Sequence, residues 1–316
     1  MNVPNRFSIQ DYVPAYNEED CAGALFAAKW PDGFRCPRCA HPHYYKVTSR
    51  GRHLFECRSC AHQTSLTAGT VLEGTRTPLT KWFQAMFLMQ LGISAKLLAE
   101  LISVTYKTAW LINHKLRHAI GEWDRGRPLA GDLQLLGEYY GYEYHRYFSS
   151  QFVQGELRPQ PVVVGVSLDD TGDVAHVKMK AVDGPEGDHS AVRGGTGGEG
   201  SVECFVQNHV AGGEAAGHAE QLQRGHHGRS PAHHAWREAV RWLARTFGGI
   251  GPKHLQAYLN EFCFRRICRN DILTELISSC GITKTITYRR LVDARSGVRP
   301  IKWVFRPPAR VQKRTG

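Results

Sequence analysis

Four cysteines in two pairs carry the clearest chemical signal of this sequence. Cys36 and Cys39 form one Cys-x-x-Cys pair, Cys57 and Cys60 form the second, and seventeen residues separate the pairs. A two-residue gap lets both thiolates of a tight turn reach one ion at about 2.3 Å, and two such turns complete a tetrahedron. The spacing predicts a structural zinc site, because four thiolates leave no position for a reactive water. Redox-active pairs or buried thiols are the alternative.

The segments around and after these cysteines have regular periodicity. An amphipathic helix is predicted over 18–30 and short strands over 34–75. Apolar residues recur at helical spacing from Leu79 to Met86, and interruptions at Gly92 and at 103–105 separate a short second helix from a long third one. This pattern is typical of a helix-turn-helix, and the polar face of the third helix is predicted to lie in a DNA groove. The residues of that face are Lys107, Trp110, His114 and Arg117.

The second half of the chain contains strands, a low-complexity segment and two helices. Segments 133–144 and 161–180 have β-forming composition, and a turn at 169–172 divides the second into a hairpin. Turn formation explains the carboxylates there better than metal binding does. Residues 183–234 are rich in Gly and His and are predicted to be loop; a solvated segment is favoured over a transition-metal site. Amphipathic helices follow, the second opened by Pro252.

Positive charge is concentrated at the C-terminus. The chain carries a net charge of +11, and residues 284–316 supply nine of these charges, with ten Lys and Arg against one acid. Lys and Arg near phosphates release condensed counterions, so this excess favours a polyanionic partner. A basic tail that is only solvated is the alternative.

Nothing in the N-terminal residues indicates a signal peptide, because a charged region followed by an apolar one is missing. The longest uncharged apolar run, from Trp82 to Leu91, is about half of the ~20 residues that a membrane span needs. We therefore expect a cytoplasmic protein without membrane association. Thiols stay reduced in that compartment, which favours metal binding over disulfides.

The residues flanking the cysteines also resemble a known family. The segment from Trp30 to Thr70, followed by Lys81-Trp82-Phe83, is similar to the zinc-ribbon start of a family of insertion-sequence transposases, and the string from Gly251 to Leu259 is similar to the end of their catalytic domain. The resemblance implies an RNase H-like (DDE-type) core, in which three acidic or amide side chains hold two Mg²⁺ or Mn²⁺ ions for phosphodiester chemistry. It also implies double-stranded DNA as partner, at the terminal repeats of the element, and a homo-oligomer.

The sequence departs from this family at the catalytic acids. Gly137 stands where the family has the Asp of an Asp-Glu pair, and Glu138 follows it. The second motif, an Asp-Gly expected near 209–220, has no counterpart beyond Ala219-Glu220. Glu238 is the nearest match to the third position, with a surface ion pair as the favoured alternative because arginines share its helix face. The candidate catalytic residues are therefore Glu138 and Glu238.

Together these patterns predict a multidomain α+β protein. Its parts are an N-terminal helix and zinc ribbon (1–75), a helix-turn-helix bundle (76–125), a degenerate RNase H-like α/β core (126–282) and a basic tail (283–316). The predicted function is that of a transposase-like DNA-binding protein from an insertion sequence, and we expect this protein to have lost catalysis. Whether any enzymatic activity remains is left open. The alternatives are a domesticated or decayed DNA-binding regulator, and a zinc-ribbon adaptor that binds RNA or polymerase.

Overall fold

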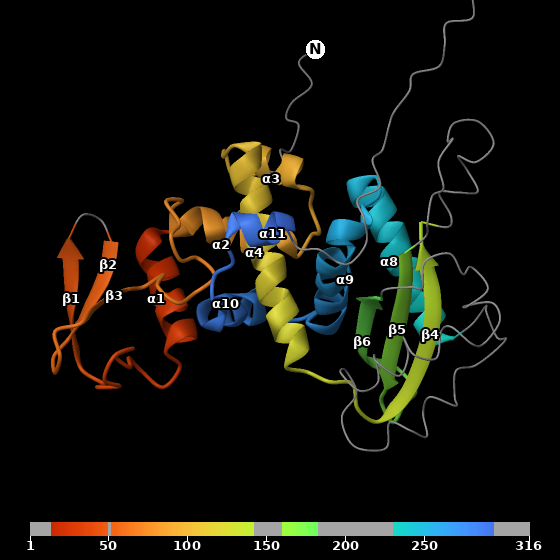
Figure 1. The fold of residues 1–316 in the computed structure, drawn as a ribbon, viewed down its shortest axis with the longest axis horizontal. Coiled ribbons are helices and arrows are strands. Elements are labelled where there is room, and N and C mark those ends of the chain that lie inside the picture. The colour runs from red at the N-terminus through yellow and green to blue at the C-terminus, as the bar shows by residue number, and fades with distance from the viewer. Residues whose placement is uncertain (1–13, 50–51, 142–159, 183–229, 294–316) are drawn as a thin grey trace, which may run out of the picture.

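The computed structural model of the protein describes residues 14–49, 52–141, 160–182 and 230–293 (Figure 1). A small sheet lies at one end of the molecule and a second sheet at the other, with a group of helices between them (Figure 1). The predicted mixed α+β class is confirmed. The basic tail from residue 294 onward lies outside the described residues.

The first sheet is antiparallel, with strand order β1-β2-β3. Its strands are β1 (Tyr44–Ser49), β2 (Arg52–Cys57) and β3 (Gln63–Ser65), and helix α1 (Glu18–Lys29) precedes them. An aromatic cluster joins α1 to the sheet, since the ring centroids of Phe26, Trp30 and Phe55 lie 4.9–5.4 Å apart. Lys29 adds a polar link, because its ammonium donates to the carbonyls of Ser65, Leu66 and Ala68. The predicted helix and strands are confirmed.

Three helices follow the ribbon at the predicted positions. They are α2 (Leu79–Met89), α3 (Ala95–Leu101) and α4 (Tyr106–Arg125). Hydroxyl caps fix two of their starts: Ser94 accepts from the N–H of Leu97 at 3.3 Å and Thr105 from that of Thr108 at 3.2 Å. Each such cap stabilises a helix by about 1 kcal/mol. The apolar stripe of α4 is buried, and its residues are Ile112, Leu116, Ala119 and Ile120.

The second sheet is also antiparallel, with strand order β4-β5-β6. It consists of β4 (Asp132–Tyr140), β5 (Gln160–Leu168) and β6 (Val174–Ala181), and helices α8 (Pro231–Phe247) and α9 (Pro252–Ile267) pack on it. The predicted hairpin is confirmed, and the carboxylate of Asp169 accepts the N–H groups of Thr171 and Asp173 at its turn. An RNase H-like core stays a prediction, because this part of the chain shows only three strands among the described residues.

The low-complexity segment ends earlier than the composition predicts. Residues 183–229 lie outside the described residues, but residues 231–234 form the first turn of α8 and not a loop. Ser230 caps this helix by accepting the N–H of His233 at 3.2 Å, and Pro231 occupies its first turn. Local capping therefore outweighs the His-rich composition here.

The C-terminal helices return to the N-terminal half of the molecule. They are α10 (Ile272–Ile282) and α11 (Tyr288–Asp293). Helix α10 packs against α1 and α4, although the sequence placed its residues with the core of 126–282. The N–H of Val71 donates to the carbonyl of Cys280 at 3.1 Å, and Trp123 donates to Glu275 at 2.7 Å. Packing of the apolar residues of α10 into the first core, with Leu276 fully buried, explains the difference.

Among the described helices, none has both the length and the apolar character that crossing a membrane requires.

Candidate metal centre and neighbouring sites

The four predicted cysteines meet at one end of the ribbon. Their sulfur atoms all lie within 4.8 Å of one another. The Sγ–Sγ distances are 3.7 Å for Cys36–Cys60, 3.5 Å for Cys39–Cys57 and 3.4 Å for Cys39–Cys60. A tetrahedron with Zn–S bonds of about 2.3 Å has edges of about 3.8 Å, so the set fits one zinc ion. Within the described residues, no other group of three or more Cys, His, Asp or Glu is placed to share a metal.

The two cysteine turns have matching geometry. In each turn a backbone N–H two residues after the first cysteine donates to its sulfur at 3.4 Å: Arg38 to Cys36, and Ser59 to Cys57. The residue after each pair has a left-handed backbone, with φ of 59° at Ala40 and 53° at Ala61. N–H groups aimed at sulfur stabilise thiolate, which is the form that binds zinc.

The pKa of the Cys36 thiol is shifted in the direction that favours the zinc-binding thiolate. Desolvation acts to raise its pKa, but the N–H groups of Arg38 and Cys39 and bonds to neighbouring sulfurs prevail and lower it to about 7. A thiol with such a pKa is about half deprotonated at pH 7, far more than an ordinary cysteine. The zinc site would thus be closed and structural, with its four thiolates holding the two turns together.

Basic side chains adjoin the metal-binding cysteines in sequence. Arg35, Arg38 and Arg58 are exposed close to the cysteines in sequence. The guanidinium of Arg58 lies 4.6 Å from the ring centroid of Tyr45, a residue that is 56% exposed. This end of the ribbon therefore presents positive charge and an aromatic face to solvent.

Comparison with known proteins identifies this part of the chain. Residues 16–63 match a family model described as a transposase zinc-ribbon domain. These residues are therefore similar to a transposase zinc ribbon. This supports the family that the sequence resembles, the zinc-ribbon insertion-sequence transposases.

One curated relative supports the same family. An uncharacterized protein in transposable element ISH50 of Halobacterium salinarum is 28% identical over 122 residues, which is 38% of this chain. The matched region spans 40% of the relative's length. No solved structure matches the chain.

The predicted DNA-contacting face of α4 is not one exposed surface. Lys107 is exposed and Trp110 is half-buried, but His114 and Arg117 are only 3% and 2% exposed because α9 packs over them. The guanidinium of Arg117 donates to Glu261 at 2.6 Å. The assignment of His114 and Arg117 to an exposed groove-binding face is therefore corrected.

Aromatic and basic groups enclose His114. Its ring centroid lies 4.0 Å from that of Trp110 and 5.0 Å from that of His254. Burial, followed by the charges of Arg117 and His254, lowers the pKa of His114 to about 2. The imidazole is therefore neutral in the folded protein across the physiological range.

This burial makes stability depend on pH. The folded state keeps His114 neutral while the unfolded chain binds a proton near pH 6.5, so stability is lost as the pH falls below that value. At pH 5.5 this group alone is expected to reduce the free energy of unfolding by about 1.4 kcal/mol relative to pH 8. Urea unfolding of wild type and His114→Gln at both pH values measures it. Equal pH dependence in the two proteins would contradict the expectation.

Glu138, the first candidate catalytic acid, lies on β4 and contacts α8. Its carboxylate is 3.2 Å from Nδ1 of His233, in the first turn of that helix. Both side chains are partly exposed, at 25% for Glu138 and 20% for His233. Sequence reasoning missed this pairing because His233 belongs to a His-rich segment that was predicted to be loop. The one sequence signal that placed His233 on a helix was the Ser230-Pro231 helix start before it.

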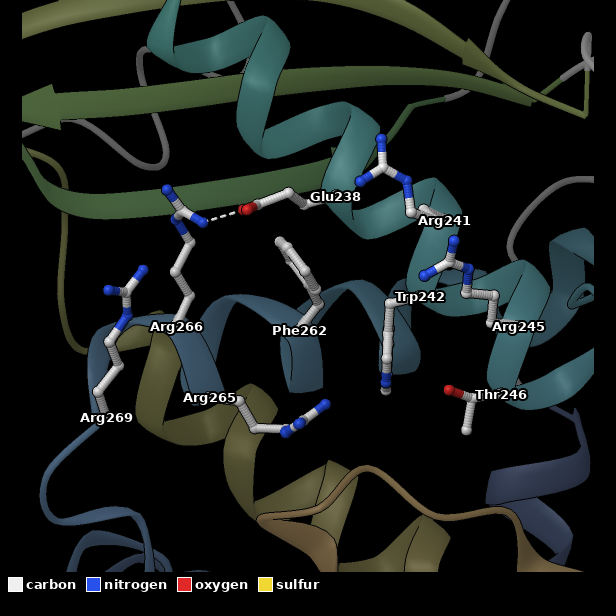
Figure 2. Close-up of a pocket in the computed structure, with 9 residues that line it drawn as sticks. All are labelled: Glu238, Arg241, Trp242, Arg245, Thr246, Phe262, Arg265, Arg266 and Arg269. Atoms are coloured by element: carbon white, nitrogen blue, oxygen red, sulfur yellow. Dashed lines mark hydrogen bonds and ion pairs between the residues drawn. The ribbon is translucent and has the colours of Figure 1, made fainter.

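Glu238, the second candidate, lies on α8 and pairs with a residue of α9. Its carboxylate forms an ion pair with Arg266, which Figure 2 shows pointing toward it, and a second contact with His234 at 3.2 Å. The ion-pair interpretation of Glu238 is thus supported, although its partner comes from another helix and not from Arg241 or Arg245.

Two buried acids were not predicted from the sequence. Glu261 pairs with Arg117 as described, and Asp124, at the end of α4, pairs with Lys178 and Lys180 of β6. Burial acts to raise the pKa of Asp124, but the two ammonium groups hold it below its usual value. The sequence signal that could have revealed a buried acid is a carboxylate among the apolar residues of a helix. Glu261 is such a residue on α9.

Proposed function

We propose that the protein is a transposase-like DNA-binding protein of an insertion sequence that does not cleave DNA strands. The transposase zinc-ribbon domain, with four sulfurs spaced to hold one zinc, is the observation that carries the proposal. The net charge of +11 adds support, because a basic protein gains affinity for DNA by releasing counterions.

Two exposed regions are suited to contact duplex DNA. The first is the basic end of the ribbon, with Arg35, Arg38 and Arg58. The second is the start of α4, where Tyr106 and Lys107 are exposed. In a helix-turn-helix the first residues of the recognition helix reach the base edges, so burial of the later residues of α4 is compatible with this role.

The absence of cleavage is proposed from the acids that the chain offers. Two-metal phosphodiester chemistry needs several carboxylates converging on Mg²⁺ or Mn²⁺. Here the family's first Asp is Gly137, Glu138 contacts an imidazole, and Glu238 is neutralised by Arg266. A metal held by Glu138 and Glu238 would lower the barrier to attack by water. Among the described residues, however, no group of three or more possible metal ligands includes either carboxylate.

One labelled duplex carrying the terminal repeat of the element tests binding and cleavage together. We expect a gel shift that weakens steeply between 50 and 200 mM salt, on the order of 10³-fold or more if about six phosphates are contacted, and intact strands after incubation with Mg²⁺ or Mn²⁺. A decayed or regulatory DNA binder gives this result.

Two outcomes would contradict the proposal. Structured RNA that displaces the duplex at equimolar concentration would support the adaptor alternative. Nicking that disappears in Glu138→Gln or Glu238→Gln would show a surviving transposase, and the variants would identify the carboxylate that acts.

A further inference from the structure

An arginine groove lies between α8 and α9, distinct from the ribbon and from the start of α4 (Figure 2). It encloses about 430 Å³. Trp242, Phe262 and Thr246 line it together with Glu238, which is its single acid. The arginines of the groove are Arg241 and Arg245 from α8, and Arg265, Arg266 and Arg269 from α9 and the residues after it.

The groove carries more positive charge than its own carboxylate can neutralise. Five guanidinium groups against one carboxylate leave four net positive charges in the lining. Arg266 takes the carboxylate of Glu238, and Arg265 donates to the carbonyl of Gln90 at 3.2 Å. Arg241, Arg245 and Arg269 are exposed, and none has an ion-pair or hydrogen-bond partner among the described residues. Like charges that line one groove repel one another, and an anion bound between them relieves that repulsion.

Two buried donors on residues that line the groove also lack acceptors. Nε of Arg266 and Nε1 of Trp242 are both buried with no hydrogen-bond partner among the described residues. A buried N–H without an acceptor costs about 1–3 kcal/mol. Gly92 lies against these side chains, with a left-handed φ of 65°, and a Cβ there would lie 2.3 Å from Nη1 of Arg265 and 2.7 Å from Nε1 of Trp242, so both would have to move. A ligand that offers only acceptors would complement the charges of the exposed arginines.

We propose that the arginine groove binds the phosphate backbone of duplex DNA. A phosphate offers acceptors and no donor, and guanidinium groups bind it in bidentate geometry. The groove is open along one side, and its three unpaired arginines lie on α8 and in the segment that follows α9, an arrangement that suits a linear polyanion. The proposal rests on the proposed DNA-binding function and adds a contact at the other end of the molecule from the ribbon (Figure 1).

The triple variant Arg241→Ala, Arg245→Ala, Arg269→Ala tests the proposal in the full-length, zinc-loaded protein. Each phosphate contact contributes about 0.9 to the slope of log K against log salt, so the slope should become shallower by up to about 2.7. The triple Lys variant keeps the charges and should keep the wild-type slope. Arg125→Ala, which removes an arginine that is 73% exposed at the end of α4, should also keep it.

The controls separate the possible failures. If the wild type binds the duplex and the Ala triple variant has the same slope and an unchanged melting temperature, the groove proposal is wrong while the proposed function stands. If the wild type binds no DNA, both are wrong. Poly-glutamate that displaces the duplex from the wild type, and binds the triple Ala variant at least ten-fold more weakly, would assign the groove to an acidic protein and overturn the DNA proposal.

Discussion

Cys39→Ser and Cys57→Ser are each expected to unfold the zinc ribbon and to weaken DNA binding. Structural zinc contributes about 10–16 kcal/mol to small zinc modules, more than a ribbon of three short strands can replace by packing. Cys57 is buried and Cys39 is exposed, yet the loss should be similar because each sulfur supplies one ligand of the tetrahedron. Zinc content per chain and near-ultraviolet circular dichroism of the aromatic cluster measure the effect.

Cys268→Ser is the matched control for these variants. Cys268 ends α9 and lies outside the cysteine cluster, so its variant should keep zinc, circular dichroism and DNA affinity. Chelation of the wild type should reproduce the ribbon variants, and added zinc should reverse it. A Cys57→Ser protein that retains stoichiometric zinc and an unchanged aromatic spectrum would disprove the four-thiolate site.

Glu261→Ala is expected to reduce the free energy of unfolding by about 3–5 kcal/mol. Glu261 and Arg117 are each 1% exposed and joined at 2.6 Å, so removal of the carboxylate leaves an unpaired charge between α4 and α9. The ring of Tyr258, whose centroid lies 3.8 Å from the guanidinium carbon of Arg117, would replace only part of the stabilisation that Glu261 gives to this charge. Urea unfolding followed by circular dichroism measures the loss.

The double variant Arg117→Met, Glu261→Met tests whether the loss of unfolding free energy in Glu261→Ala comes from leaving Arg117 without its ion-pair partner. An apolar replacement of both partners is expected to lie within about 1–2 kcal/mol of the wild type, because Nη2 of Arg117 and Oε1 of Glu261 already lack partners among the described residues. Arg125→Ala removes an exposed ion pair with Glu122 and should cost less than about 1 kcal/mol. A double variant as unstable as Glu261→Ala would mean that the loss comes from packing.

Features that depend on neighbouring residues could be predicted from the sequence. The metal site followed from two Cys-x-x-Cys turns, whose geometry is set within four residues each. Helices α3 and α4 followed from periodicity and from interruptions at Gly92 and at 103–105, because helix ends are fixed by local hydrogen bonds. The Asp169 turn likewise depended on one side chain and the next few N–H groups.

The sequence by itself determined the zinc ribbon, helices α1 to α4, α8 and α9, and the hairpin, since short-range spacing sets their geometry. Only the tertiary structure decided which faces are buried. Arg117 and Glu261 are 144 residues apart, and their pairing turned a predicted DNA-contacting face into an interior. The same holds for the contact of Glu138 with His233 and for the convergence of arginines between α8 and α9. A polar helix face carries no local mark of what packs against it, because burial depends on contacts between distant segments.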